Sequence, residues 1–253
     1  YTEFFLFENH LFNRLQYRSL CNAIITTGEC ISKPLIKAFD LAAEKVKVIP
    51  TAVSPPKKSL SYEKAKEALR EELGLGNESK FIGQISVLRG WKGHPFLLES
   101  FNLLASDNPT LHLVIVGDGP MMPALMKRRD LSEFGNRIHL VGHKSNVFDY
   151  IKAFECVILS SIKNEGIPQC LLQAMAMAVP VIGTRVGGIP EIITDGKTGL
   201  LVNPEDSISM ERKIRILLND KSAREHLAAN ARRLVSAEFR WEILGNKTLE
   251  LFY

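Results

Sequence analysis

Apolar runs separated by helical patterns occupy the chain from residue 81 to residue 202. The strand-like runs are FIGQISV (81–87), LHLVIV (111–116), RIHLV (137–141), CVILS (156–160), PVIGT (180–184) and GLLV (199–202). Between the first four, residues 97–105, 121–134 and 147–153 carry apolar side chains at helical spacing. Strands that alternate with helices predict a parallel sheet whose crossovers cover both faces. We therefore expect an α/β fold, a Rossmann-like parallel sheet of about six strands with helices on both faces.

The chain on either side of this alternation follows other patterns. Residues 22–29 (NAIITTGE) and 45–53 (KVKVIPTAV) are two short strand-like runs with one helix between them. That is too little to fold alone. Residues 207–220 and 222–239 carry apolar side chains at helical spacing with basic residues between them, which is typical of surface helices.

The segment SSIKNEGIPQCLLQAMAMAVPVIGTRVGGIPEII (160–193) concentrates the features that bind ligands. Glu165 precedes a helix entrance in which Gly166 allows close backbone approach and Pro168 suits the first turn. Free N–H groups at such an entrance hold phosphate. The buried run 180–184 follows, and then a second glycine turn. The combination of an acid, a helix start, a buried strand and a glycine turn suits an anionic, sugar-bearing ligand.

Several motifs together resemble one family. In order, they are E-G-x-P, A-M-A, P-V-I-G-T, V-G-G-I-P-E-I-I and D-G-K-T-G-L-L-V. This series resembles the donor-sugar site of retaining glycosyltransferases of family 4, also called glycosyl transferases group 1, and the resemblance extends from about Val48 to the C-terminus. It implies the GT-B fold, in which two Rossmann-like domains face each other across a cleft.

The resemblance also implies a division of the chain. Residues 1–53 match the end of the N-terminal, acceptor-side domain, and residues 54–60 (SPPKKSL) match the interdomain linker. Residues 61–238 match the nucleotide-sugar donor domain. Residues 239–253 match a helix that crosses back to the N-terminal domain, with Trp241 and Phe252 as its anchors. Most of the acceptor domain is then expected to lie upstream, and this fragment alone is expected to bind donor weakly and transfer little.

The departing nucleoside diphosphate needs positive charge at its phosphates. The sequence contains no D-x-D motif, the usual ligand set for a metal, so we expect no metal and no cofactor. The resemblance identifies Lys92 as the diphosphate-binding lysine; the alternative is a solvated lysine at a helix start. The family's partner arginine is replaced by Val87. Arg89, two residues further on, could reach the same phosphates because its planar fork tolerates a displaced backbone, or it is a plain surface arginine.

The acid motif of the family, E-x7-E, is present in part. The resemblance identifies Glu165 as the catalytic-site acid that holds the donor-sugar hydroxyls, with Gly166, Ile167 and Pro168 at the diphosphate. The alternative for Glu165 is an acid that only stabilises a helix start. The second acid, which binds the ribose diol, is Gln173 here. An amide still holds a diol but without the strength of a charge-assisted bond.

Two more segments match ligand contacts of the family. His143 and Lys144 lie where the family contacts the nucleotide base, although a single histidine is more often an ordinary loop residue. The turn Gly187-Gly188 would bring backbone N–H groups toward the donor.

Composition limits the remaining possibilities. The net charge of +4 allows an anionic nucleotide or a peripheral membrane contact but is too low for a nucleic-acid binder. Four scattered cysteines, Cys21, Cys30, Cys156 and Cys170, form no C-x-x-C pair, so we expect reduced thiols, no zinc site and a cytoplasmic protein, soluble or peripheral at the inner membrane face.

The sequence therefore predicts a retaining, metal-independent transferase that moves a hexose-type unit from a nucleoside-diphosphate sugar to a glycan, lipid-linked or small-molecule acceptor. A nucleotide-sugar epimerase of the same fold and a non-catalytic nucleotide-binding module stay open. The departures at Val87 and Gln173 favour the second of these. The sequence names neither the base nor the sugar.

Overall fold

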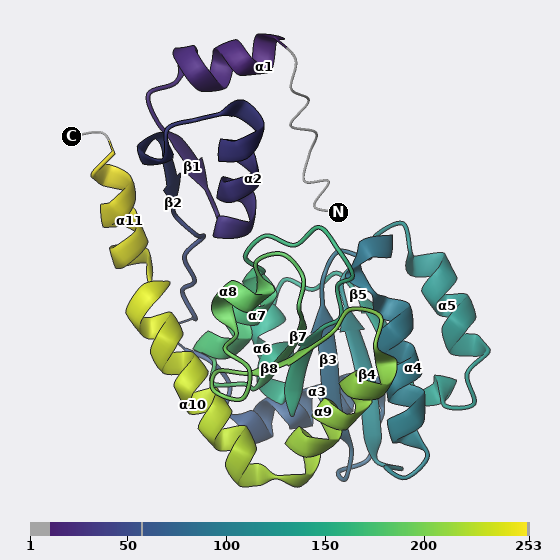
Figure 1. Ribbon diagram of the computed structural model, residues 1–253. Helices are drawn as coiled ribbons and strands as arrows, with labels where there is room; N and C mark the ends of the chain where they lie inside the picture. Colours follow the sequence, from purple (N-terminus) through teal and green to yellow (C-terminus); the bar gives the residue numbers. More distant parts are fainter. Residues whose placement is uncertain (1–10, 57, 252–253) are drawn as a thin grey trace.

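The computed structural model describes residues 11–56 and 58–251, which form two parallel sheets of different size (Figure 1). The larger sheet has six strands: β3 (Lys80–Ile85), β4 (Leu111–Val116), β5 (Ile138–Gly142), β6 (Cys156–Leu159), β7 (Val181–Thr184) and β8 (Leu200–Val202). Their order is β5-β4-β3-β6-β7-β8, and every pair is parallel. The predicted Rossmann-like sheet with helices on both faces is confirmed.

The strand order places a switch point in the middle of this sheet. From β3 the chain moves outward to β4 and β5, and then returns to the other side of β3 to build β6, β7 and β8. The loops that leave β3 and β6 therefore diverge at their carboxyl ends and open a crevice between them. Ligands of open α/β sheets bind in such a crevice.

Helices cover both faces of the six-stranded sheet. One face packs against α3 (Tyr62–Leu73), α6 (Val147–Ala153), α7 (Gln169–Ala176), α8 (Ile189–Ile192) and α10 (Lys221–Glu238). The other face packs against α4 (His94–Ala105), α5 (Met122–Asp130) and α9 (Ser207–Asn219). Short 3-10 turns, η3 (Gly90–Lys92) and η4 (Gly135–Arg137), precede α4 and β5.

Strand β4 shows how the sequence builds the two cores. All six of its residues are buried. Val114 and Val116 join the hydrophobic cluster on the α3 face, while Leu113 and Ile115 join the cluster on the α4 face. Successive side chains of a strand point to opposite faces, so a strand covered on both sides is apolar at most positions. The exception in β4 is buried His112, whose Nδ1 lies 3.0 Å from His139 Nε2.

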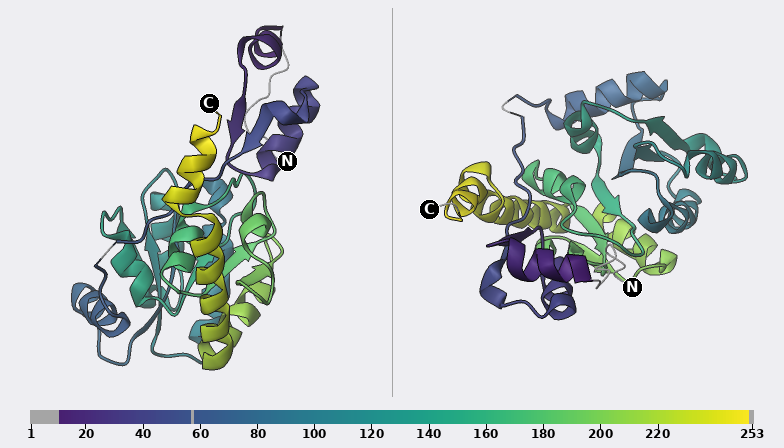
Figure 2. Two further views of the ribbon diagram at one scale, coloured as in Figure 1. Left: turned by 90° about the vertical axis from the view of Figure 1, so that its left-hand side faces the viewer. Right: turned by 90° about the horizontal axis from the view of Figure 1, so that it is seen from above.

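A two-stranded unit formed by the beginning of the chain lies above the carboxyl ends of the large sheet in Figure 1 and in the left view of Figure 2. It consists of α1 (Leu11–Leu15), a π-helical turn η1 (Gln16–Leu20), β1 (Ile24–Thr26), α2 (Glu29–Phe39), the 3-10 turn η2 (Ala43–Lys45) and β2 (Val46–Val48). The two predicted strand-like runs are β1 and β2, which pair in parallel. The helix at 11–20 has no counterpart among the sequence-based expectations.

Helix α11 (Trp241–Leu249) extends beyond α10 and runs beside the two-stranded unit (Figure 2). An apolar groove between them is lined by residues that include Ile25, Ile49 and Leu244. Leu244 is the buried residue of this helix, and Trp241 is 70% exposed but lines the same groove, so its role as an anchor on the acceptor domain stays a prediction. Phe252 lies outside the described residues. No helix of the described ranges combines the length and the apolar character needed to cross a membrane.

Candidate donor-binding site

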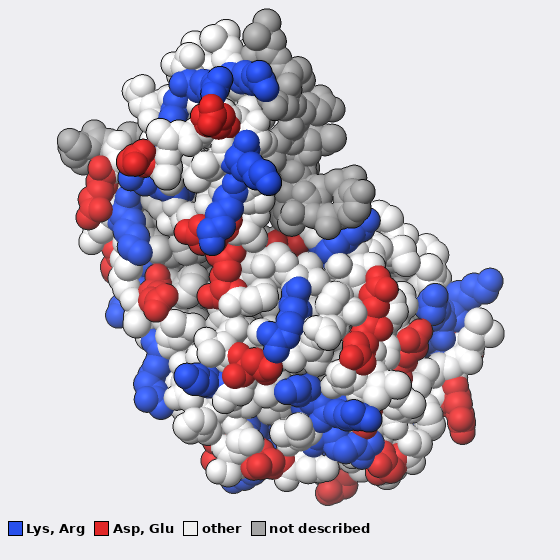
Figure 3. Space-filling model, viewed as in Figure 1, with Lys and Arg blue, Asp and Glu red and all other residues white. Residues whose placement is uncertain are grey.

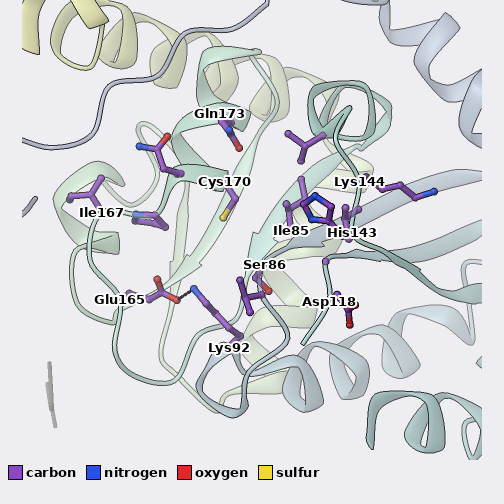
Figure 4. Close-up of a pocket in the computed structure, with 16 residues that line it drawn as sticks. Ile85, Ser86, Lys92, Asp118, His143, Lys144, Glu165, Ile167, Cys170 and Gln173 are labelled. Atoms are coloured by element: carbon purple, nitrogen blue, oxygen red, sulfur yellow. Dashed lines mark hydrogen bonds and ion pairs between the residues drawn. The ribbon is translucent and has the colours of Figure 1, made fainter. Parts of the chain in front are cut away.

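A cavity of about 640 Å³ opens at the switch point, at the carboxyl ends of β3, β4 and β6 (Figure 4). Its wall is formed by the loops that follow β3, β4, β5 and β6 and by the starts of α6 and α7. The lining residues are Ile85, Ser86, Val87, Lys92, Val116, Gly117, Asp118, His143, Lys144, Val147, Glu165, Ile167, Pro168, Gln169, Cys170 and Gln173. Residues far apart in the sequence thus meet at one place.

Lys92 and Glu165 face each other at one end of this cavity (Figure 4). The Lys92 ammonium donates to Glu165 Oε1 at 2.5 Å, and the Ser161 hydroxyl donates to the same oxygen. Glu165 is only 4% exposed, so its charge needs a partner inside the protein. The pair supplies one cation and one acceptor at a single end of the cavity.

Buried Gln84, the fifth residue of β3, joins the two loops that carry this pair. Its amide nitrogen donates to the Lys92 carbonyl oxygen at 3.0 Å, and its oxygen accepts from the Ser160 hydroxyl at 2.7 Å. The Ser160 hydroxyl also lies 2.9 Å from the Lys92 carbonyl oxygen. A polar side chain at this buried strand position is stabilised only because every one of its groups finds a partner.

The Gly187-Gly188 turn packs against the backbone of Glu165. Gly187 has φ +52°, and a Cβ atom there would lie 1.9 Å from the Glu165 carbonyl oxygen. The backbone N–H of Gly188 donates to that same oxygen at 3.1 Å. Neither glycine lines the cavity, so their observed role is to let two backbones approach, and the expected contact with the donor stays a prediction.

Arg89 lies outside the cavity wall. Its guanidinium lies over the Trp91 ring, 5.1 Å from the ring centre. Val87, at the place of the family's partner arginine, lines the cavity instead. A contact between Arg89 and phosphate therefore stays a prediction that requires the guanidinium to leave the indole ring.

The other predicted contacts surround the rest of the cavity. Ile167, Pro168 and Gln173 line it at the start of α7, and Gly166 lies in the same loop but outside the lining. His143 lines it from the loop after β5.

Lys144 lines the cavity beside His143, but its ammonium is already bound. It donates to Glu72 Oε1 at 2.6 Å, and the Tyr150 hydroxyl donates to the same carboxylate at 2.6 Å. Burial opposes ionisation of Glu72, but the hydrogen bonds from Lys144 and Tyr150 outweigh it and lower the pKa of that carboxyl. The Lys144 ammonium is thus bound to Glu72 of α3. A nucleotide base would contact the Lys144 backbone, or the Lys144–Glu72 ion pair would have to open first.

Sequence reasoning did not predict four polar residues of the cavity wall, Ser86, Asp118, Gln169 and Cys170. Ser86 follows β3 directly, and its hydroxyl lies 3.0 Å from His94 Nε2. Burial and the neighbouring Lys92 charge lower the pKa of His94 to about 4, so its ring is neutral near pH 7. Cys170 also lines the cavity, where burial raises the pKa of its thiol to about 12. Ser86 could have been found from its position directly after a central parallel strand.

The acidic and basic side chains on the face shown in Figure 3 are interspersed, and no single sign dominates that face. Within residues 11–56 and 58–251, no cluster of three or more His, Cys, Asp or Glu side chains has the arrangement that would hold a metal ion.

Known proteins resemble this chain in sequence. N-acetyl-alpha-D-glucosaminyl L-malate synthase of Bacillus anthracis is 30% identical over 185 residues, which are 73% of this chain and 48% of that protein. Alpha-D-kanosaminyltransferase of Streptomyces kanamyceticus is 29% identical over 216 residues, 84% of this chain and 55% of that protein. The chain thus spans about half the length of these two curated relatives.

Solved structures share the fold. The Anabaena protein HepE in complex with UDP and glucose superposes with a TM-score of 0.80 at 22% identity, over 92% of this chain and 63% of its own. A glycosyltransferase of Rickettsia africae gives a TM-score of 0.85 at 22% identity, over 96% of this chain and 66% of its own. The sequence model of the family Glycosyl transferases group 1 matches residues 65–234, which contain Lys92, Glu165 and Gln173. The chain therefore belongs to the group 1 glycosyl transferases.

Proposed function

We propose that this chain binds a nucleoside-diphosphate sugar in the cavity at the switch point and forms the donor side of a retaining hexosyltransferase. The observation that carries the proposal is the Lys92–Glu165 pair, because it puts a cation and a carboxylate side by side at the crevice of an open parallel sheet. The activity of the curated relatives, which are named as transferases or a synthase, supports the same reaction class.

The donor would enter with its charge toward Lys92. The diphosphate accepts hydrogen bonds from the Lys92 ammonium and from backbone N–H groups near the start of α7. Ile167 and Pro168 line the cavity at this helix start. Glu165 accepts from hydroxyls of the sugar, Gln173 holds the ribose, and the base lies toward His143 and Lys144.

The reaction breaks the bond between the anomeric carbon and the phosphate oxygen, and the acceptor hydroxyl attacks the same face. The leaving phosphate takes the acceptor proton, so no protein nucleophile is required. Lys92 stabilises the negative charge that builds up on the leaving group, and this charge stabilisation is the main contribution that a transferase of this kind makes. We propose that no metal ion is needed, because Lys92 supplies the cation and the sequence has no D-x-D motif.

The acceptor side is proposed only by class. A hydroxyl of a glycan, a lipid-linked sugar or a small molecule would approach from the side of the two-stranded unit. We propose that residues 1–53 belong to the acceptor domain and residues 61–238 to the donor domain. The linker 54–60 and the segment 239–253 with α11 would then connect the two domains. A cytoplasmic location, at most peripheral to the membrane, belongs to the same proposal.

Sugar release from a panel of nucleotide sugars tests the function, measured on the complete protein with any upstream domain present. Transfer or slow hydrolysis of one donor with retention at the anomeric carbon is the expected result. Conversion of the sugar without release would indicate the epimerase, and binding without any turnover would indicate the non-catalytic module. Unchanged turnover after removal of divalent cations with EDTA is expected; loss and recovery on adding Mg²⁺ would contradict metal independence.

A further inference from the structure

Helix α2 has no N-terminal cap of its own. Its N-cap residue is Gly28, which offers no side-chain acceptor to the first-turn amides. The first N–H groups of a helix have no partner inside the helix. Here the N–H groups of Glu29 and Cys30 donate to the two carboxylate oxygens of Glu191, at 2.8 and 2.7 Å. Glu191 belongs to α8, so the six-stranded unit supplies the cap for a helix of the two-stranded unit.

The contact is close and fits the charge of the helix. A carboxylate at a helix N-terminus is favoured by the helix dipole, and each of its oxygens accepts one amide. Gly28 is buried, and a Cβ atom there would lie 3.2 Å from both Glu191 Oε2 and Ile167 Cγ1. The missing side chain therefore lets the helix start approach the six-stranded unit.

The same helix start lies on the loop that carries Glu165. The Cys30 thiol lies 3.7 Å from the Glu165 carbonyl oxygen. A Cβ atom at Gly166 would lie 3.4 Å from Thr27 Oγ1. In Figure 1 the lower end of α2 faces α8 and the loop before α7. Cys30 thus connects the two, because its N–H donates to Glu191 and its thiol lies against the backbone of Glu165.

We propose that Glu191 is a positioning residue that clasps α2 to the donor side and thereby fixes the Glu165 loop at the sugar end of the cavity. Glu191 itself is exposed, so the clasp opens and re-forms without disturbing a buried core. The effect on the donor rests on the proposed function, whereas the clasp itself does not.

Amide hydrogen exchange, followed by NMR at Glu29 and Cys30, tests the clasp directly. Glu191→Ala should speed exchange of both amides about tenfold while leaving the main unfolding midpoint in place. Glu191→Gln keeps one acceptor oxygen, so its effect should be intermediate. Glu29→Gln is the matched control, because it removes a negative charge from the same helix end without touching the cap, and its Cys30 amide should exchange as in the wild type. Unchanged exchange in Glu191→Ala overturns the clasp, whatever the activity.

Kinetics on the complete protein test the positioning role. Glu191→Ala should lower kcat about tenfold and leave UDP, GDP or ADP binding within about twofold, because the clasp acts on the sugar end rather than on the phosphates. Gly28→Ala crowds the same contact without changing charge and should act in the same direction. Faster exchange with unchanged kcat would reduce Glu191 to a structural cap and overturn the positioning role. An enzyme without any transfer activity would remove the proposed function but leave the exchange result valid.

Discussion

The six-stranded unit and the two-stranded unit share one pattern, parallel strands joined by a helix, but they differ in what they bury. The large sheet has a hydrophobic cluster on each face. Among the described residues, the small sheet has one cluster of four buried residues, Leu35, Phe39, Leu41 and Val46. Three helices of the six-stranded unit, α3, α9 and α10, are capped by the residue before them, Ser61, Asp206 and Asp220, whereas α2 takes its acceptor from Glu191 of the other unit. The six-stranded unit thus has a large core of its own, whereas the small unit depends on its neighbours.

Core truncation should separate the two units most strongly. Phe101 is fully buried in the α4 cluster, so Phe101→Ala should lower the free energy of unfolding of the six-stranded unit by about 3–5 kcal/mol. Phe39→Ala should leave that transition in place and instead make residues 11–53 more sensitive to protease. Urea unfolding and limited proteolysis measure the two effects. An equal loss from Phe39→Ala would mean that both units unfold together.

Acid should weaken the six-stranded unit through its buried histidines. Burial lowers the pKa of His94 and of His112 to about 4, with Lys92 adding to the first and His139 to the second. Because these folded-state pKa values lie below the unfolded value near 6.5, the unfolded chain binds more protons, and stability falls as pH drops from about 6.5 toward 4. For His94 alone the loss between pH 7 and pH 5 is about 2 kcal/mol.

Urea unfolding at several pH values measures this slope. His94→Gln should flatten it, whereas His226→Gln, on an exposed turn of α10, should leave it unchanged. A slope that stays the same in His94→Gln would show that another group carries the acid sensitivity.

Loss of Gln84, which links two loops inside the six-stranded unit, should lower the unfolding free energy more than loss of Gln169, which bonds the segment after the two-stranded unit. Gln84→Leu removes the hydrogen bonds by which the Gln84 amide links the Lys92 and Ser160 loops, and we expect a loss of about 1–3 kcal/mol in unfolding free energy together with weaker diphosphate binding. The comparison is Gln169→Leu, whose amide donates to the Thr51 carbonyl at an exposed site and should cost about 0.5 kcal/mol or less. Similar losses of unfolding free energy in both variants would contradict the role of Gln84 in holding the Lys92 and Ser160 loops together.

The two halves of the acid motif should differ in kinetics. Glu165→Gln should mainly lower kcat, because the contact that we propose for Glu165 is with the reacting sugar. Gln173→Glu should mainly change donor KM, since the ribose keeps its charge during transfer. Steady-state kinetics on the complete protein separate the two; an equally large fall in kcat for Gln173→Glu at constant KM would contradict this division.

The alternation of apolar runs was enough to predict the six-stranded sheet, because strands covered on both faces are apolar at nearly every position, as β4 is apart from His112. The meeting of Lys92 with Glu165 could be predicted only through the family's motifs, since no local pattern brings together residues 73 positions apart. The Gln84 bridge and the Glu191 cap were not predicted. Both depend on which backbone groups lack partners, which only the assembled fold reveals. The stacking of Arg89 on Trp91 depends in the same way on the local path of the loop.

Calorimetric titration of the tightest-binding nucleoside diphosphate and of its free nucleoside, with wild type, Lys92→Ala and Arg89→Ala, tests the central claim most directly. A charge-assisted bond to phosphate is worth about 1.5–3 kcal/mol, so Lys92→Ala should weaken the diphosphate at least about tenfold and leave the nucleoside nearly unchanged. If Arg89 swings onto the phosphates, at about 2.7–2.9 Å in a liganded structure, Arg89→Ala should show a smaller loss of the same kind. Equal losses of diphosphate and nucleoside in Lys92→Ala would contradict the phosphate role and with it the assignment of this cavity to the donor.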